Sequence, residues 1–158
     1  MDRLTDLYVR HAPECLRLAY LLTFDRGVAE DLVQDAFVRV SGRLTHLRSP
    51  DAFGRYLRRT VVNLSRNHLR RQRVHRAYLE RHGGGEEAVE GPTAASLAVR
   101  QALRDLPERQ RTAIVLRFWL DVPEAEAAEI LRCRPGTFRS LVSRGMQSLR
   151  IAIGETDE

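Results

Sequence analysis

Five polar side chains recur at helical spacing in one arginine-rich segment of the sequence. Intervals of three and four residues place them on one face of a helix: Arg55, Arg59, Asn63, Arg66 and Arg70. Tyr56 and Asn67 flank this face. Guanidinium groups bind phosphates, an amide can read a base edge, and an aromatic ring can stack on an unpaired base. A solvated basic face is the alternative, but the asparagine and the tyrosine favour contact with nucleic acid.

An earlier segment has the opposite character. Four residues line the solvent side of a helix predicted over residues 28–40: Asp31, Gln34, Asp35 and Val38. Carboxylates repel the phosphates of DNA, so this row is either a solvated surface or a docking site for a protein partner with a basic helix. The residues alone favour neither interpretation.

Residues 122–150 have the pattern of a helix-turn-helix. A short helix over 124–131 leads through Arg132–Pro135 into a second helix, which buries Phe138, Val142, Gly145 and Leu149. The opposite side of that second helix presents hydroxyl, amide and guanidinium groups: Arg139, Ser140, Ser143, Arg144 and Gln147. Such groups suit base edges and phosphates in the major groove, although helical hairpins are common in other proteins too.

No motif for bond chemistry accompanies these surfaces. The sequence lacks a phosphate-binding glycine loop, HExxH and GxSxG, and Gly83–Gly85 follows no predicted strand. Cys15 and Cys133 are isolated, and no histidine pairs with a carboxylate at metal-binding spacing. We therefore expect a protein that is not an enzyme and that needs no metal and no cofactor.

The charge of the chain is concentrated in two blocks. All 26 positive residues are arginine, against 21 acidic ones, for a net charge of +5 over 158 residues. Residues 39–82 hold twelve arginines against two acids, and residues 132–150 hold five against none. Both blocks coincide with the surfaces described above, which favours nucleic acid as a partner. With no apolar run near 18 residues and no signal core at the N-terminus, the expected location is cytoplasmic.

The elements that position these side chains are expected to be helices throughout. Two short stretches, over 4–11 and 16–22, precede helices over 28–40 and 51–71. Breaks at Pro107, Pro123 and Pro135 separate four more: 94–106, 108–119, 124–131 and 136–151. The glycine-rich, acidic stretch from His82 to Pro92 predicts a flexible linker. We thus expect an all-α chain with two small helical domains, residues 1–75 and 95–153, joined by a linker over 76–94.

Four short motifs occur in order along the chain. They are AEDLVQDAF at 29–37, DAF at 51–53 with YL at 56–57 and VNL at 62–64, LPERQR at 106–111, and PGTFRS at 135–140. In this order and spacing the chain resembles the extracytoplasmic-function (ECF, group IV) sigma factors, in particular the actinobacterial SigE-like group. The resemblance covers about residues 3–72 and 95–151. It implies a sigma-2 and a sigma-4 domain, and a factor that binds bacterial core RNA polymerase and directs promoter-specific initiation.

The resemblance also implies roles for the surfaces. Asp31, Gln34, Asp35 and Val38 match the surface that docks on the β′ clamp helices of the polymerase, whose β flap is a further implied contact. The residues implied for the −10 element and its melted strand are Leu44, Thr45, His46, Leu47, Arg48, Arg55, Tyr56, Arg59, Asn63, Arg66, Asn67 and Arg70. The residues implied for the −35 duplex are Arg134, Thr137, Arg139, Ser140, Ser143, Arg144 and Gln147. Family members are commonly held by an anti-sigma factor, but nothing in the sequence identifies one; neither a membrane nor a small-molecule substrate is expected.

Departures from the family pattern keep two alternatives open. Pro123 stands in place of a serine, Ala127 of an isoleucine, Arg132 of a helix-ending glycine and Leu141 of an arginine. These changes motivate a sigma-like adaptor that binds polymerase without directing initiation. A stand-alone helix-turn-helix regulator is the other alternative, but the acidic row argues against it because such a regulator has no need of that row.

Overall fold

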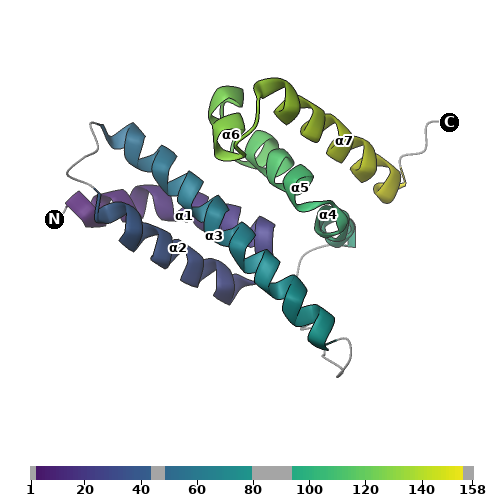
Figure 1. The fold of residues 1–158 in the computed structure, drawn as a ribbon, viewed down its shortest axis with the longest axis horizontal. Helices are drawn as coiled ribbons and strands as arrows, with labels where there is room; N and C mark the ends of the chain where they lie inside the picture. Colours follow the sequence, from purple (N-terminus) through teal and green to yellow (C-terminus); the bar gives the residue numbers. More distant parts are fainter. Residues whose placement is uncertain (1–2, 44–48, 80–93, 155–158) are drawn as a thin grey trace.

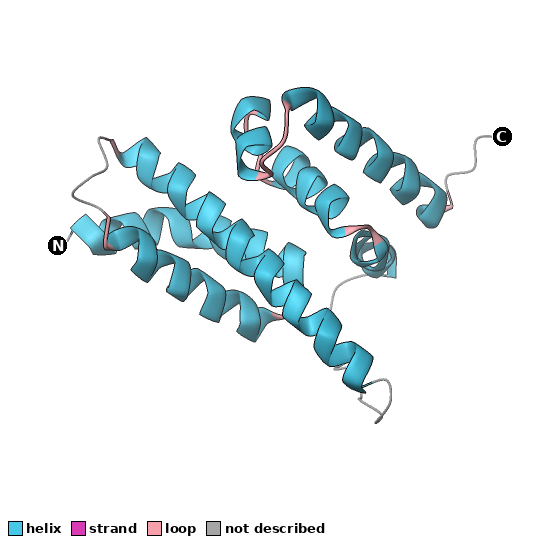
Figure 2. Cartoon of the chain, viewed as in Figure 1, coloured by secondary structure: helices cyan, strands magenta, loops and turns pink. Residues whose placement is uncertain are grey.

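Helices joined by short turns make up the described part of the chain, which confirms the all-α expectation (Figure 1, Figure 2). The computed structural model describes residues 3–43, 49–79 and 94–154. The first unit holds α1 (Arg3–Thr23), α2 (Arg26–Ser41) and α3 (Pro50–Leu79). The second unit holds α4 (Ala94–Asp105), α5 (Glu108–Ile114), the π-helical turn η2 (Val115–Trp119), α6 (Glu124–Ile130) and α7 (Pro135–Ile153).

α1 is a single helix, so the expectation of two short stretches was wrong. Pro13 lies inside it and removes one backbone hydrogen bond from the helix. One continuous apolar face runs past the proline, however, with Leu7, Cys15, Leu18 and Leu22 buried. Burial of that face offsets the lost bond, because each buried leucine contributes about 1.5–3 kcal/mol.

The turn between α1 and α2 is tight. Phe24 has a φ of +56°, a left-handed conformation that ends a helix. Asp25 then starts α2, because its Oδ1 accepts a hydrogen bond from the backbone N–H of Val28 at 3.1 Å. The Phe24 ring lies beside that of Tyr20 of α1, with the ring centroids 6.4 Å apart, and also contacts residues of the second unit.

α3 is longer than the sequence predicted. Phe53, Leu57, Val61 and Leu64 are buried as expected, but the helix continues to Leu79. It therefore extends into the segment predicted as the linker over 76–94, and residues 80–93 of that segment lie outside the described residues.

The proline breaks in the second unit are confirmed. Pro107 and Pro123 precede α5 and α6, and Pro135 is the first residue of α7. The predicted helix over 108–119 changes from α to π geometry at Val115. α5 and α7 pack so closely at Gly145 of α7 that a Cβ added there would lie 2.4 Å from Ile114 Cδ1 of α5.

The two units pack against each other. α6 contacts α3, and α5 and η2 contact α1 (Figure 1). One core cluster joins apolar residues of the first unit, such as Leu18 and Val61, to residues of the second, such as Leu116 and Phe138. Phe24 packs instead with residues of the second unit: Ala102, Leu103, Leu106, Ile114 and Leu149. The helices that carry the candidate site are thus held by a shared core.

Candidate nucleic-acid interface

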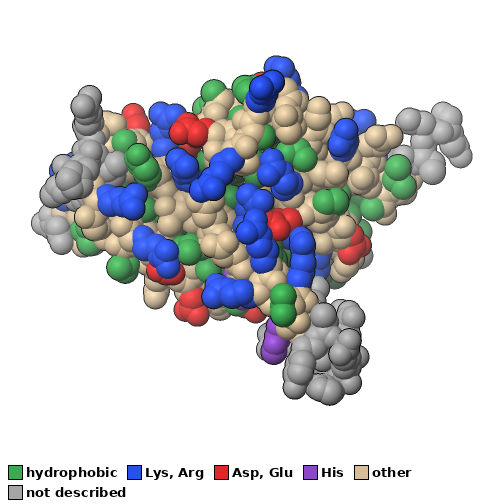
Figure 3. Space-filling view, viewed as in Figure 1, with side chains coloured by type: hydrophobic (Ala, Val, Ile, Leu, Met, Phe, Trp, Pro, Cys, Tyr) green, Lys and Arg blue, Asp and Glu red, His purple; other side chains and the backbone are tan. Residues whose placement is uncertain are grey.

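The row predicted on α3 lies opposite the buried face of that helix. Arg55 and Arg70 are exposed, while Arg59, Asn63 and Arg66 are half-buried. The flanking residues Tyr56 and Asn67 are exposed as well. In the space-filling view, arginine side chains gather on the face of the molecule that presents α3 (Figure 3). We call the five residues Arg55, Arg59, Asn63, Arg66 and Arg70 the α3 row.

One member of the α3 row is engaged by the second unit. Arg66 Nε donates to Glu108 Oε1 of α5 at 2.5 Å. The two side chains are only 14% and 8% exposed. Arg73, further along α3, donates to the other oxygen of the same carboxylate at 3.4 Å. Arg66 therefore faces a carboxylate of its own chain.

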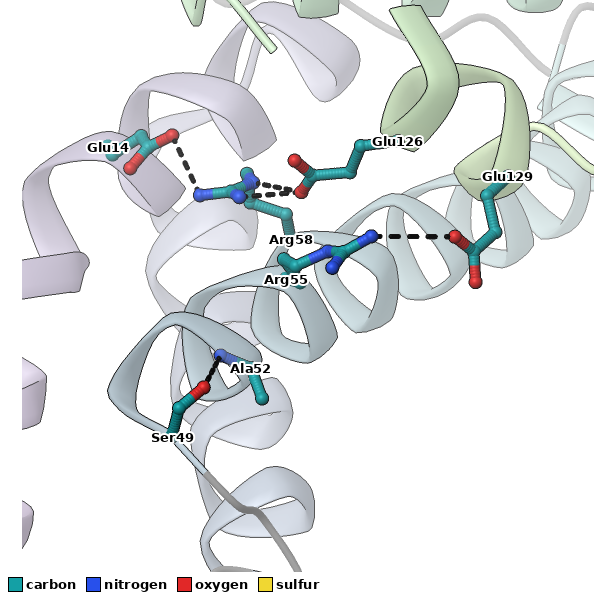
Figure 4. Close-up of polar contacts among 7 residues, drawn as sticks. All are labelled: Glu14, Ser49, Ala52, Arg55, Arg58, Glu126 and Glu129. Carbon is teal, nitrogen blue, oxygen red and sulfur yellow. Dashed lines mark hydrogen bonds and ion pairs between the residues drawn. The ribbon is translucent and has the colours of Figure 1, made fainter. Parts of the chain in front are cut away.

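A second arginine of α3, which sequence reasoning missed, forms another link between the units. Arg58 Nε and Nη2 donate to Glu126 Oε1 of α6 at 2.9 and 2.5 Å (Figure 4). Its Nη1 donates to Glu14 of α1 at 3.5 Å. Arg58 lies between the apolar face and the α3 row, so helical periodicity alone gave no signal for its partner.

The amino-terminal part of the α3 row forms looser contacts with α6. Arg55 and Arg59 lie 3.8 and 4.0 Å from the carboxylate oxygens of Glu129, whose side chain is 63% exposed. A cavity of about 210 Å³ separates the two helices here, lined by Ala52, Arg55, Tyr56, Arg59, Glu126, Glu129 and Ile130. Such exposed ion pairs contribute about 0–1 kcal/mol to the free energy of unfolding, because water screens both charges.

The acidic row of α2 is open to solvent. Asp31, Gln34, Asp35 and Val38 are all exposed. Asp35 accepts a hydrogen bond from Arg39 Nε at 2.9 Å, one turn along the helix. The opposite face of α2 is buried in the core, so the row is held rigidly by packing.

The row predicted on α7 is likewise exposed. All seven members are open to solvent: Arg134, Thr137, Arg139, Ser140, Ser143, Arg144 and Gln147. Arg139 Nη1 donates to Glu124 at 3.1 Å. Arg134 and Arg144 form no ion pair within residues 3–43, 49–79 and 94–154. We call these seven residues the α7 row.

The departures noted in the second unit are accommodated by the fold. Arg132 takes the left-handed conformation itself, with a φ of +54°. Ala127 is fully buried, and Leu141 packs against the core cluster. α6 begins after Pro123 without a side-chain cap. The helix-turn-helix geometry is therefore retained. The left-handed backbone conformation of Arg132 lowers the stability of the fold by about 1–2 kcal/mol.

The remaining candidate residues precede α3 in the sequence. Leu44, Thr45, His46, Leu47 and Arg48 lie outside the described residues. No group of side chains that could hold a metal lies among the residues the structure describes. In the same part of the chain, none of the helices is both long and apolar enough to cross a bilayer.

Two side chains of α1 have displaced pKa values. Burial, followed by the charge of Arg10, lowers the pKa of His11. Burial, followed by the charge of Glu14, raises the pKa of Cys15 to about 12. His11 packs on Phe53 of α3, and a Cβ added at Gly54 would lie 2.9 Å from its ring. His11 is thus a neutral packing group beneath α3, and Cys15 is an unreactive one.

Comparison with known proteins places both units. Residues 7–74 match the family model for Sigma-70 region 2, and residues 96–149 match Sigma-70, region 4. The RNA polymerase sigma-E factor of Streptomyces coelicolor is 30% identical over 146 residues, which cover 90% of this chain and 82% of that protein. The ECF RNA polymerase sigma factor SigM of Mycobacterium tuberculosis is 31% identical over 150 residues, covering 94% and 76%.

One solved structure has the same fold. The sigma factor RpoE, co-crystallised with the anti-sigma factor NepR from Bartonella quintana, superposes with a TM-score of 0.78. It is 23% identical and is matched over 98% of both chains. At that identity the likeness supports the helical architecture and nothing finer.

Proposed function

The chain belongs to the sigma-70 family as a sigma factor of the extracytoplasmic-function type, and from this premise we propose how its surfaces divide the work of initiation. It binds core RNA polymerase and promoter DNA and directs transcription initiation. The observation that carries the division is that the acidic row of α2, the α3 row and the α7 row lie on three different helices of one scaffold. Residues 1–75 form the sigma-2 domain, 76–94 the linker and 95–153 the sigma-4 domain.

The acidic row of α2 is the polymerase-docking surface of this proposal. Asp31, Gln34 and Asp35 bind the β′ clamp helices, and Val38, 69% exposed, adds an apolar contact. Carboxylates cannot approach the DNA phosphates, so a basic protein surface is the complementary partner. The full exposure of the row and its rigid support by the core favour this role.

The α3 row binds the melted −10 strand. Arg55, Arg59 and Arg70 hold phosphates, Asn63 reads a base edge, and Tyr56 and Asn67 border the path of the strand. Residues 44–48, which precede α3 in the sequence, capture a flipped base. Flipping a base costs a few kcal/mol, and stacking an unpaired base on an aromatic ring returns about 1–3 kcal/mol, so strand binding favours melting.

The α7 row reads the −35 element as duplex DNA. α7 is the second helix of the helix-turn-helix, the position from which side chains enter a major groove. Arg134 and Thr137 lie at its start, where the recognition residues of this motif reach base edges. The exposure of all seven side chains supports this assignment.

The factor supplies binding energy and no bond chemistry of its own. We propose that it works in the cytoplasm without a cofactor, while the polymerase forms the phosphodiester bonds. We also propose that it belongs to the actinobacterial SigE-like group, supported by identities of 29–30% with the sigma-E factors of two Streptomyces species. An anti-sigma factor, such as the NepR bound to the Bartonella protein, is a proposed regulator.

Run-off transcription tests the function directly. Purified core polymerase, fragmented genomic DNA and this protein should give specific start sites. Binding of duplex DNA without transcripts would indicate a stand-alone regulator instead, and polymerase binding without starts would indicate an adaptor.

Asp31→Arg with Asp35→Arg tests the docking surface. Reversing both charges should abolish pull-down of core polymerase, because the row would then repel a basic partner. Glu30→Arg is the matched control, since Glu30 is an exposed acid of α2 outside the row. Unchanged affinity in the double variant, with helical content intact, would refute the docking assignment.

A further inference from the structure

An ion pair joins the two helices of the helix-turn-helix. Arg139 Nη1 of α7 donates to Glu124 Oε1 of α6 at 3.1 Å. Glu124 is the first residue of α6, and Arg139 lies in the second turn of α7. The Glu124 side chain is 33% exposed and that of Arg139 is 68% exposed. The carboxylate is thus the more enclosed partner, and the guanidinium is the group that projects into solvent.

The Arg139 guanidinium also lies against the first turn of α7. Its Nη2 is 3.8 Å from the position that a Cβ would take at Gly136. Long side chains of a helix point back towards its N-terminus, so this direction agrees with ordinary helix geometry. Both ends of the fork are therefore located, with Nη1 towards α6 and Nη2 over the first turn of α7. The first turns of a recognition helix are the part that approaches base edges.

Arg139 differs in this respect from the other arginines of the α7 row. Arg134 and Arg144 form no ion pair in the part of the chain that the structure describes. Contacts to phosphate position a protein on the duplex, whereas contacts to base edges carry the sequence information. A base contact needs donors held in a set direction, and a side chain that is already oriented loses less freedom on binding. Among these arginines, Arg139 is the one prepared for a base.

Guanine is the base that fits such a fork. Its N7 and O6 both accept hydrogen bonds in the major groove, and they match two N–H donors of one arginine. A guanidinium carries five N–H donors, and the pair with Glu124 uses a single one of them. The carboxylate also offsets part of the positive charge, which weakens attraction to the phosphates of any sequence. The pair therefore favours discrimination between bases over general affinity for DNA.

We propose that Glu124 is a positioning residue that holds Arg139 for a guanine of the −35 element. The inference rests on the role proposed above for the α7 row, and it adds to that role a residue of the preceding helix. Arg139 makes the base contact, and Arg134 and Arg144 add affinity. Glu124 does not touch the DNA and acts through Arg139.

Base-pair discrimination by the assembled factor tests this role. The chain is combined with core polymerase and titrated onto duplexes in which each base pair of a −35 element, mapped by run-off transcription, is replaced in turn. Arg139→Ala should remove the discrimination at one G·C pair, which is about fivefold or more for a bidentate contact. Glu124→Ala should remove most of the discrimination at the same pair and none elsewhere. The double variant should lose no more than Arg139→Ala alone, because Glu124 acts through Arg139.

Two further variants separate positioning from charge and from helix stability. Glu124→Gln keeps an acceptor oxygen at the same reach, so it should retain most of the discrimination. Glu129→Ala removes the same charge from the same helix, but its carboxylate faces Arg55 and Arg59 of α3, so base preference should be unaltered. Tighter binding of Glu124→Ala to every duplex, with the guanine preference kept, would mean that Glu124 only shields a charge and would overturn the proposal. Equal weakening on every duplex would assign Glu124 to the stability of α6 and overturn it as well.

The outcomes distinguish the positioning role from the function. Specific transcription starts with an unaltered base preference in Glu124→Ala would overturn the positioning role and leave the sigma-factor function intact. If the unaltered chain gives no starts, duplexes selected from a random pool by the chain alone replace the mapped element. A preference for one G·C pair that Glu124→Ala and Arg139→Ala both remove would then support the positioning role and refute the initiation role. Absence of any such preference would overturn both.

Discussion

The α3 row and the α7 row contain the same kinds of side chain in different surroundings. On α3, Arg66 is buried against Glu108, and Arg55 and Arg59 face Glu129. On α7, Arg134 and Arg144 are exposed, and Arg139 alone of the row's arginines is paired, within the part of the chain that the structure describes. The α3 row is thus partly covered by the second unit, whereas the α7 row is open to solvent.

This difference matches two kinds of target. Duplex DNA exists before polymerase arrives, so a surface that reads it can remain open. A single strand exists only after melting, and exposed arginine rows bind any polyanion. Under the roles proposed above for the two rows, covering the α3 row would limit unproductive binding, whereas covering the α7 row would prevent recognition. Five tests can break or sharpen this contrast.

The largest effect is expected from Arg59→Ala with Asn63→Ala. Loss of a phosphate contact and a base contact should reduce open-complex formation by about 30-fold or more, at about 1–3 kcal/mol for each contact. Core binding should be unchanged because the acidic row of α2 is intact. Permanganate footprints measure melting of the promoter duplex. Normal footprints in the variant would mean that the α3 row is only a solvated basic face.

Arg134→Ala with Arg144→Ala should weaken duplex binding by the chain alone. At about 1–3 kcal/mol for each contact, the loss is about 30-fold or more. The matched variant Arg55→Ala with Arg70→Ala removes two exposed arginines from the α3 row and should change duplex binding little. Fluorescence anisotropy at fixed salt, on a promoter duplex mapped by run-off transcription, compares the two. Equal losses would erase the contrast between the rows.

Gly145→Ala tests the packing that supports the α7 row. The added methyl group would overlap Ile114 of α5, so the free energy of unfolding should fall by about 1–3 kcal/mol. Gly136→Ala is the control, because the nearest side-chain atom there lies 3.8 Å away. Urea unfolding followed by circular dichroism measures both. An unaffected Gly145→Ala variant would mean that α5 and α7 can move apart without cost.

Acid should lower the free energy of unfolding through histidines of the first unit. Burial lowers the pKa of His11 and, together with the charge of Arg71, that of His68, whereas no histidine occurs after residue 82. Below pH 6.5 these two histidines bind protons in the unfolded chain more readily than in the folded chain, because folding lowers their pKa values. The free energy of unfolding therefore falls as the pH drops from 6.5 towards the pKa values of the folded state.

Urea unfolding at about pH 7.5 and about pH 5.5, above the range where ordinary carboxylates titrate, measures this loss. His11→Gln should make the pH dependence shallower. A dependence of the same steepness in that variant would assign the proton uptake to other groups.

The smallest effect is expected from Glu129→Gln. Its pairs with Arg55 and Arg59 are exposed and long, so the free energy of unfolding should change by about 0–1 kcal/mol. The same measurement on Glu126→Gln should give a larger loss, since that carboxylate is buried against Arg58. Similar losses in both variants would contradict the distinction between buried and exposed contacts.

Sequence reasoning predicted the helices where local chemistry decides them. Apolar periodicity predicted the buried face of α3, and Pro107, Pro123 and Pro135 marked the helix starts. The sequence did not predict that α1 is one continuous helix. The hydrogen bond lost at Pro13 is offset by burial of the apolar face of α1, and local sequence pattern does not measure that burial.

The ion pairs that the arginines of α3 form with the second unit could not be predicted from the sequence. Arg66 and Glu108 are 42 residues apart in sequence, and Arg58 and Glu126 are 68 apart. Helical periodicity describes which face a residue occupies, but the partner on that face depends on how distant helices pack. Exposure of the acidic row and of the α7 row, by contrast, followed from periodicity because nothing described in the chain packs over them.

The shared core has a consequence for how the molecule melts. Phe24 leaves the helices on which it is built and enters the apolar cluster around Leu103 and Ile114, while Phe138 of α7 joins the cluster around Leu18 and Val61. Each half therefore shares part of its buried core with the other. Heat should therefore melt both halves in one cooperative calorimetric transition, even though the family joins them as separate modules.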